Sequence, residues 1–462
     1  MSAAEPLLPP LEAAALAAEA QVWCAQHGLV VAAEAEATFT HAPLSLLPTP
    51  FPRPAFEQAL RLAAPFATLC AAVAADDAFL TSTLASACAS DPFTARLLLL
   101  HRQASAQPHA SSVELALLRS DYMVDEPSGA LLQVEINTIA ASFGCLSALT
   151  GQLHRQLLPR MGLDARYPAS SLPANGAREG LAGGLAQAWR AAGSAGSVLF
   201  VVQPGERNVF DQQWLQATLW SEHGVRCVRR TLAQVAAQGR VDAQGGLHVG
   251  DDHVSVVYFR SGYTPDDYPG EAEWQGRSLL ECSAAVKCPS IRWHLAGAKK
   301  VQQELARPGV LERFVGGESA ALLRGCFAGL WALDGDDAEE VVAMALAEPE
   351  GFVLKPQREG GGNNLYGAEM CARLGDREGL GAFILMRRIR PPMNRALFLR
   401  LGKVTAAEAL GELGVYSVYC ARGGEVLVNE GVGHLLRTKT ASSNEGGVAA
   451  GFAVLDSPLL VD

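Results

Sequence analysis

The spacing of apolar residues changes along the chain. Between residues 11 and 100 apolar positions recur at helical spacing, as in LEAAALAAEAQVWCAQH and FEQALRLAAPFATLCAAVA, so helices are predicted there. Strand patterns begin at LALLRSDYM and continue in LLQVEINTIAASFG. The Gly- and Ala-rich stretch that follows, 172–184, fits either a linker or a loosely patterned helix.

From residue 197 onward short apolar runs alternate with helical patterns. SVLFVVQ, VRCVRR and VSVVYF are predicted strands, and DQQWLQATLWSEHG and TLAQVAAQG are predicted helices, the first closed by Gly224. This alternation predicts a small parallel α/β unit over 197–295. A helix in AGAKKVQQELARPG should end at Pro308, and the predicted strands FVLKPQ and AFILMRRI stand on either side of a glycine run.

Composition narrows the class of protein. A chain of 462 residues with 49% hydrophobic residues is globular and long enough for about two or three domains. A net charge of −11 argues against a nucleic-acid binder, although a local basic cleft for a small anion stays open. The ten cysteines are scattered without a CxxC, so we expect no zinc site. We also expect a cytoplasmic protein without an export signal or a membrane span.

The glycine run lies in KPQREGGGNNLYG, residues 355–367. It fits no P-loop, Rossmann turn or protein-kinase motif. Glycines can turn successive N–H groups toward an anion, and Lys355 adds a point charge for a phosphate. Glu359 is a candidate metal ligand, and Asn363 and Asn364 supply amide groups. The stretch therefore suits a magnesium nucleotide, and the alternative is a flexible surface hairpin.

Polar residues alternate with apolar ones in LLQVEIN. An unbroken strand would place Gln133, Glu135 and Asn137 on one face, and Leu132, Val134 and Ile136 on the other. A carboxylate and an amide oxygen two residues apart suit Mg²⁺, which prefers oxygen ligands. The alternative is a half-exposed strand with ordinary polar residues.

Cationic residues of interest stand in two further stretches of the chain. Arg119 could pair with a substrate carboxylate or form a structural salt bridge. Arg437 and Lys439 would share one face of a strand, where they suit two anions or form a solvated basic pair. The small residues of EGGVAAG, 445–451, suit either a loop that closes over a small ligand or a plain surface turn.

Taken together, these stretches resemble the eukaryotic-type glutathione synthetases of the ATP-grasp superfamily. The resemblance runs in order through RSDYM, VEINTIAASFG, ERNVFDQ, VVYFRSGY, KPQREGGGNNLYG, ILMRRI, GELGVY, GHLLRTK and EGGVAAG. It implies an α/β (α+β) ATP-grasp fold. Residues 1–196 would hold a helical N-terminal region and the first part of the catalytic core, 197–295 an inserted substrate-binding subdomain, and 296–462 the rest, with a glycine-rich lid at about 338–405.

The resemblance also implies an activity. The family joins γ-glutamylcysteine to glycine with ATP through an acyl phosphate, releasing ADP and phosphate, as a cytoplasmic homodimer that uses a pair of Mg²⁺ ions per active site. No enzyme nucleophile is needed, which agrees with the absence of a Ser/His/Asp or Cys/His signature. Two alternatives remain: a homoglutathione-type ligase that uses β-alanine or another amine, and a nucleotide-binding regulator without catalysis.

The family's residue roles transfer by position. The metal ligands would be Glu135, Asn137 and Glu359, and the catalytic residues Arg119, Lys355, Gly360, Gly361 and Arg437. Residues implied at ATP are Glu135, Lys299, Lys355, Pro356, Gln357, Arg358, Glu359, Gly360, Gly361, Gly362, Asn363, Asn364, Tyr366, Met386, Arg387, Arg388, Ile389, Glu412, Lys439 and Glu445. Residues implied at the peptide substrate are Arg119, Ile139, Ala140, Ala141, Ser142, Glu206, Arg207, Asn208, Gln212, Arg260, Ser261, Gly262, Tyr263, Arg437, Val448 and Ala449.

Two positions depart from the family pattern. The hinge beside adenine usually reads MEKI and here reads MRRI, so Arg387 replaces an acidic residue. Ala140 stands where the family often has serine, which removes a hydroxyl from the substrate loop.

Overall fold

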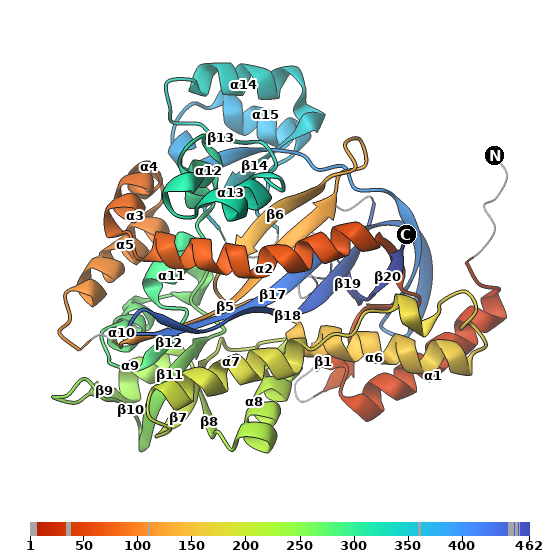
Figure 1. The fold of residues 1–462 in the computed structure, drawn as a ribbon, viewed down its shortest axis with the longest axis horizontal. Coiled ribbons are helices and arrows are strands. Elements are labelled where there is room, and N and C mark those ends of the chain that lie inside the picture. The colour runs from red at the N-terminus through yellow and green to blue at the C-terminus, as the bar shows by residue number, and fades with distance from the viewer. Residues whose placement is uncertain are drawn as a thin grey trace.

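The computed structural model describes residues 7–33, 38–109, 111–358, 362–441, 448, 451 and 453–462 (Figure 1). At its centre is a seven-stranded, mostly antiparallel sheet, the main sheet, in the order β16-β3-β19-β18-β17-β5-β6. Its strands are β16 (Asn394–Arg400), β3 (Leu44–Ser45), β19 (Ala453–Asp456), β18 (Glu425–Thr440), β17 (Lys403–Arg422), β5 (Val113–Val124) and β6 (Leu131–Asn137).

Helices cover both faces of the main sheet. Helix α2 (Arg53–Ala74) packs on one face, and α6 (Gly144–Arg160) and α7 (Ala177–Ala191) pack on the other. Residues 177–184 of the Gly- and Ala-rich stretch are therefore the first part of helix α7, and residues 172–176 form the loop before it. The helix lies so close to the sheet that a Cβ at Gly180 or Gly184 would collide with Val432 or Val418, which explains its small residues.

The predicted parallel strands are present in a second sheet. Strands β8 (Cys227–Arg230), β7 (Ser197–Val201), β11 (Asp252–Phe259) and β12 (Val286–Cys288) run parallel, and β10 (Leu247–Val249) and β9 (Gly239–Val241) extend the sheet antiparallel. Its helices are α8 (Val209–His223), α9 (Leu232–Gln238) and α10 (Glu271–Glu281). Gly224 ends α8 in a left-handed conformation, as predicted. The loops after β7 and β11 meet at one edge of this sheet because neighbouring parallel strands end together.

A smaller unit lies above the main sheet in Figure 1. Its antiparallel sheet has the order β13 (Leu330–Ala332), β15 (Phe383–Arg387), β14 (Phe352–Pro356), and α14 (Ala338–Ala347) and α15 (Gly367–Gly375) cover it around a separate apolar core. We call residues 330–387 the upper unit. β16 pairs with β17 and β3, so the chain is back in the main sheet before residue 405. The domain boundaries themselves stay predictions.

The N-terminal part is helical apart from one segment. Helices α1 (Pro10–His27), α2, α3 (Asp77–Thr83), α4 (Ala85–Ser90) and α5 (Pro92–Ser105) agree with the prediction. The prediction is wrong between them, where β1 (Val30–Ala32), β2 (Phe39–His41), β3 and β4 (Thr49–Pro52) form. β3 joins the main sheet beside β19, and β4 pairs with β20 (Pro458–Val461). All four strands are very short, β1 and β2 pair only with each other, and the last partners of β3 and β4 lie some 400 residues away, so no local pattern marks them.

The remaining elements connect these units. They are α11 (Ile291–Ala296), α12 (Lys299–Ala306), α13 (Gly317–Arg324) and single 3₁₀ turns at Ala169–Ser171, Pro265–Asp267, Leu311–Arg313, Pro349–Gly351 and Leu380–Ala382. Among the described helices, none alone has the length and apolar character to cross a membrane. The α2–α3 pair meets that test on length and composition only, with a bend of 87° at the junction.

Candidate active site

A cavity of about 440 Å³ lies between the main sheet and the upper unit. Fourteen of the predicted residues line it: Arg119, Glu135, Asn137, Lys299, Lys355, Asn364, Tyr366, Met386, Arg387, Arg388, Ile389, Glu412, Arg437 and Lys439. Met123, Val134, Glu350, Val353, Arg390, Pro391, Met393, Leu410 and Ala441 complete the described lining. Eight Arg or Lys residues face three Glu residues in this lining, which makes it the local basic cleft expected within an acidic protein.

Strand β6 brings Glu135 and Asn137 into the cavity but not Gln133. A register shift opposite Tyr122 interrupts the alternation of its side chains. Gln133 therefore donates to Ser120 Oγ at 2.7 Å and lies near Phe66 beneath the sheet, while Val134 lines the cavity. The prediction of three polar residues on one face is wrong for Gln133, because the extra residue of a β-bulge turns the preceding side chains over.

Two lysines converge on Glu135. Lys299, the first residue of α12, places Nζ 3.2 Å from Glu135 Oε2. Lys355, on β14, places Nζ 3.9 Å from the same oxygen and donates to Val134 O at 2.9 Å. Burial disfavours a charged Glu135, yet Lys299, Lys355 and Arg437 outweigh it and lower the pKa of Glu135. We call Glu135, Lys299 and Lys355 the lysine side.

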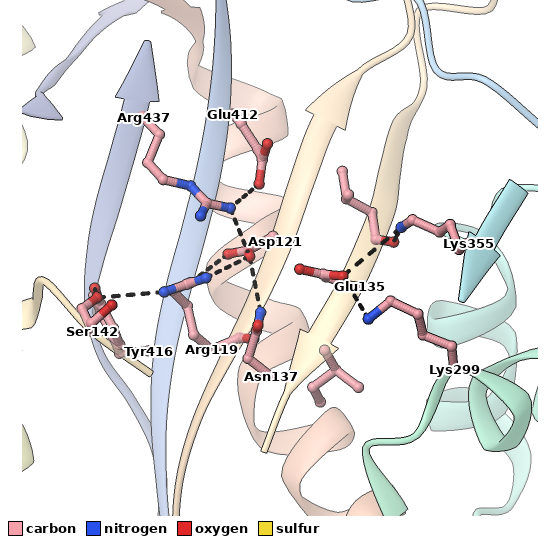
Figure 2. A network of polar contacts seen from close by, with 12 residues as sticks. Arg119, Asp121, Glu135, Asn137, Ser142, Lys299, Lys355, Glu412, Tyr416 and Arg437 are labelled. Carbon is pink, nitrogen blue, oxygen red and sulfur yellow. Dashed lines mark hydrogen bonds and ion pairs between the residues drawn. The ribbon is translucent and has the colours of Figure 1, made fainter. Parts of the chain in front are cut away.

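Two arginines converge on a buried aspartate beside it (Figure 2). Asp121 on β5 is 0% exposed. Its Oδ1 accepts from Arg119 Nε at 2.7 Å, and its Oδ2 accepts from Arg119 Nη2 at 2.9 Å and from Arg437 Nη2 at 3.0 Å. Arg437 also pairs with Glu412. Burial opposes the charged form of both arginines, but the neighbouring carboxylates raise the pKa of each above its usual value. We call Arg119, Asp121, Glu412 and Arg437 the arginine side.

Asn137 connects the two sides. Its Nδ2 donates to Asp121 Oδ2 at 2.9 Å and to Arg119 O at 3.2 Å, which fixes the orientation of the amide. In Figure 2 the lysines and arginines lie on opposite sides of Glu135 and Asn137. One carboxylate and one oriented amide oxygen form a donor set that suits Mg²⁺. Among the described residues no cluster of three His, Cys, Asp or Glu groups could hold a metal, and the third predicted ligand, Glu359, lies outside them.

A second polar cluster lies where β7 and β11 end. Glu206 accepts from Asn208 N at 2.7 Å and from Gln212 Nε2 at 3.1 Å. Both side-chain polar atoms of Asn208, and Nη1 of Arg260, are buried without a hydrogen-bond partner in the described part of the chain. Tyr263 stands on the loop after Arg260, and the interaction between them affects the pKa of both. Buried polar groups normally find partners, so this cluster suits a polar ligand group.

The loop before α6 bridges the cavity and the second cluster. Ser142 O accepts from Tyr416 Oη at 2.5 Å and from Arg119 Nη1 at 3.4 Å. The next residue, Phe143, donates its N–H to Asp211 on α8 at 2.8 Å. Asp211 also accepts from Cys145 N and Leu146 N, the free N–H groups at the start of α6. Ile139, Ala140 and Ala141 precede Ser142 in this loop, and Ala140 has a positive φ of 52°.

The other predicted residues that the structure describes do not line the cavity. Arg358 pairs with Asp91 at the start of α5, at 2.7 and 2.8 Å, and Gln357 accepts from Lys300 N at 3.0 Å. Val448 is buried in an apolar core. Pro356, Gly362, Asn363, Arg207, Ser261 and Gly262 are described outside the lining. Glu359, Gly360, Gly361, Glu445 and Ala449 lie outside the described residues, and the roles predicted for all of these stay predictions.

The arginines of the hinge pair with acidic residues of the upper unit. Arg387 contacts Glu348 at 3.1 Å and Arg388 contacts Glu350 at 3.2 Å. Their backbone N–H groups donate to Gly329 O and Gly351 O, both at 2.8 Å. The hinge is therefore fixed by its main chain, and the acidic side chains come from residues 348 and 350 instead of from the hinge itself.

Sequence reasoning missed Asp121, Tyr416 and Glu350. A signal for Asp121 was present, because Arg119 and Asp121 are two residues apart on a predicted strand and so share a face. Tyr416 and Glu350 carry no such signal, since only the pairing of distant segments brings them to the site.

Comparisons with known proteins agree with this geometry. The family profile "Eukaryotic glutathione synthase, ATP binding domain" matches residues 11–460. The chain is 46% identical over 461 residues to the chloroplastic glutathione synthetase of Solanum lycopersicum, covering 96% of this chain and 84% of that protein. It is 44% identical to the glutathione synthetase of Homo sapiens, covering 91% and 90%. A glutathione synthetase-like effector of Globodera pallida, in its apo form, has a similar fold, with a TM-score of 0.79, 23% identity and 98% coverage of both chains. The chain therefore belongs to the eukaryotic glutathione synthase family.

Proposed function

We propose that this protein joins γ-glutamylcysteine to glycine with ATP, forming glutathione, ADP and phosphate. The observation that carries the proposal is the two-sided cavity, in which lysines converge beside Glu135 and arginines beside Asp121. Phosphates and a carboxylate can meet in such a cavity, and those are the two groups that must react. The family and the names of its members support the same reaction.

The first step needs positioning and charge neutralisation. An oxygen of the cysteinyl carboxylate attacks the γ-phosphorus, the bond to the bridging β–γ oxygen breaks, and ADP leaves. Lys299 and Lys355 would neutralise the charge on the phosphates, and Arg119 and Arg437 would orient the carboxylate. Glu135 and Asn137 would hold Mg²⁺, which supplies further neutralisation of phosphate charge.

The second step uses the acyl phosphate just formed. The glycine amine attacks the acyl carbon, phosphate departs with cleavage of the C–O bond, and the amine loses a proton. Water must be excluded, because it would hydrolyse the intermediate. The γ-glutamyl end of the dipeptide would occupy the cluster of Glu206, Asn208, Gln212, Arg260 and Tyr263, where polar atoms of Asn208 and Arg260 have no partner among the described residues.

Phosphate release tests the proposal. ATP, Mg²⁺, γ-glutamylcysteine and glycine together should release phosphate in step with glutathione, and omission of the dipeptide should stop the release. Nucleotide binding without dipeptide-dependent release would instead indicate a regulator. Replacing glycine by β-alanine tests the acceptor. We expect glycine to be preferred by about tenfold or more, because one methylene is usually worth about 1–3 kcal/mol, and a higher kcat/KM for β-alanine would identify a homoglutathione-type ligase.

Three finer points stay predictions. The Mg²⁺ requirement is tested by chelation and add-back of single metals. The homodimer is tested by light scattering of the purified protein. The cytoplasmic location is tested by fractionating cells that express the chain.

A further inference from the structure

Asp121 is a fully buried carboxylate that accepts hydrogen bonds from three residues lining the cavity. Its two oxygens take four donors between 2.7 and 3.0 Å, two from Arg119 and one each from Asn137 and Arg437. It is the buried acceptor to which Arg119, Arg437 and the amide of Asn137 all donate. Without it, two guanidinium groups would lie together in a site from which water is largely excluded, at a high electrostatic cost.

Gly414 provides the space in which this contact forms. β17 lies between β5, which carries Asp121, and β18, which carries Arg437. Gly414 is the residue of β17 that faces Asp121 across the strands. A Cβ at this position would lie 2.7 Å from Asp121 Oδ1 and 2.8 Å from Arg119 Cδ. The Arg119–Asp121 pair therefore lies directly over a point where β17 has no side chain, and Arg437, paired with Glu412 two residues away on β17, contacts Asp121 beside it.

We propose that Asp121 is a positioning residue for the peptide substrate because it holds both arginines, and that Gly414 is required because it leaves room for the Arg119–Asp121 pair. The inference rests on the proposed function, because it assigns Arg119 and Arg437 to the dipeptide. Asp121 touches neither the substrate nor the nucleotide. It acts by fixing the directions in which the two guanidinium forks point.

The first test removes the charge without changing the shape. In Asp121→Asn the amide nitrogen faces groups that are themselves donors, so the arginines lose their common partner. Calorimetry should show γ-glutamylcysteine binding weakened by roughly tenfold or more, with ADP binding within about threefold of the parent. A merely structural residue would not weaken one ligand selectively.

Asp456→Asn is the matched control. Asp456 is also fully buried in the main sheet, but it accepts from Thr49, Thr438 and Ser457, none of which lines the cavity. This variant should bind both ligands as the parent does.

The second test leaves every charge in place. Gly414→Ala should displace the Arg119–Asp121 pair and weaken dipeptide binding selectively, by several-fold. Gly411→Ala, three residues away on β17, is its control, because a Cβ there would meet only ordinary contacts, the nearest 3.5 Å away at Leu436. If Asp121→Asn fails to fold by circular dichroism, the Gly414 and Gly411 pair decides the question.

The outcomes separate the two proposals. Phosphate release by the parent decides the proposed function. If the parent makes glutathione and folded Gly414→Ala binds the dipeptide as tightly as Gly411→Ala does, the positioning role is wrong and the function stands. Equal loss of dipeptide and ADP binding would also overturn it. If the parent binds no dipeptide, both proposals fail together.

Discussion

The lysine side and the arginine side lie next to each other and differ in how their charge is balanced. On the lysine side one carboxylate, Glu135, serves two cations at 3.2 and 3.9 Å. On the arginine side two cations meet two carboxylates, Asp121 and Glu412. The first group has surplus positive charge, and the second is neutral but rigidly hydrogen-bonded.

This difference matches two different tasks. Lysine is a compact point charge on a flexible stem, so it can follow a phosphoryl group whose geometry changes during transfer. Arginine presents a planar fork of donors that fixes the direction of a carboxylate. Under the proposed function, attraction of the phosphates and orientation of the carboxylate are therefore divided between neighbouring groups of one cavity wall. It can be tested by changing each side separately.

Loss of a lysine should have the largest effect. Lys355→Ala should lower kcat/KM by about a hundredfold, because one preorganised charge at a transferring phosphoryl group is worth about 3 kcal/mol. Lys300→Ala is the control, since Lys300 is also buried on α12 but pairs with Asp334 away from the cavity. If Lys355→Ala and Lys300→Ala lost the same amount of kcat/KM in a coupled phosphate-release assay, the role assigned to the lysine side would be contradicted.

Replacing an arginine of the arginine side by lysine, which exchanges a planar fork of donors for a point charge, should have the second largest effect. Arg437→Lys keeps the charge but cannot bridge Asp121 and Glu412 in the same way. We expect the KM for γ-glutamylcysteine to rise by about tenfold while the KM for ATP stays nearly constant. A variant that resembles the parent would show that charge alone suffices there.

Neutralising Glu135 should give a smaller effect that depends on the metal. Glu135→Gln removes an anionic oxygen, so the Mg²⁺ concentration for half-maximal rate should rise several-fold. It also releases Lys299 and Lys355 from their internal partner, so metal-free ATP should bind at least as tightly as in the parent. Weaker metal-free binding by calorimetry would mean that Glu135 does more than hold the metal.

Acid should act more on the stability of the folded protein than on the lysine side or the arginine side of the cavity. Burial lowers the pKa of His154 to about 4 and the pKa of His294 and His434 to about 3. Unfolded histidines take up protons near pH 6.5, so each site favours unfolding as the pH falls below that value, by about 2 kcal/mol between pH 6.5 and 5. Asp456 opposes this in part, because burial raises its pKa to about 7. The melting temperature should fall from pH 7.5 to pH 5, and a rise would mean that the carboxylate dominates.

The local spacing of apolar residues predicted most of the longer helices and strands. Helices α2 and α8 and strands β7, β8 and β11 were predictable because their apolar spacing repeats over a whole element. The strands between residues 30 and 52 were not, since each has only two to four residues, and β3 and β4 also depend on partners far away in the sequence. The bulge in β6 was not predictable either, because it depends on how β5 is paired.

More of the lysine side than of the arginine side was predictable from the sequence. Lys299, Glu135 and Lys355 follow from the family resemblance and converge in the structure as single charges. On the arginine side the cations were predicted, but Asp121, Gly414 and Tyr416 were not assigned. Their roles depend on which residues face one another across β5, β17 and β18, and this register is a property of the folded sheet.

The pairing of residues 44–52 with the last ten residues has a consequence for biosynthesis. β3 lies between β16 and β19, and β4 pairs with β20, so two strands translated early wait for partners that are translated about 400 residues later. At roughly 5–20 residues per second, about 20–80 s separate their emergence from the ribosome. During that time β3 and β4 lack these partners, and the main sheet cannot close before β19 has been translated. Chaperone demand should therefore depend on the time that the ribosome needs to translate the residues between β4 and β19.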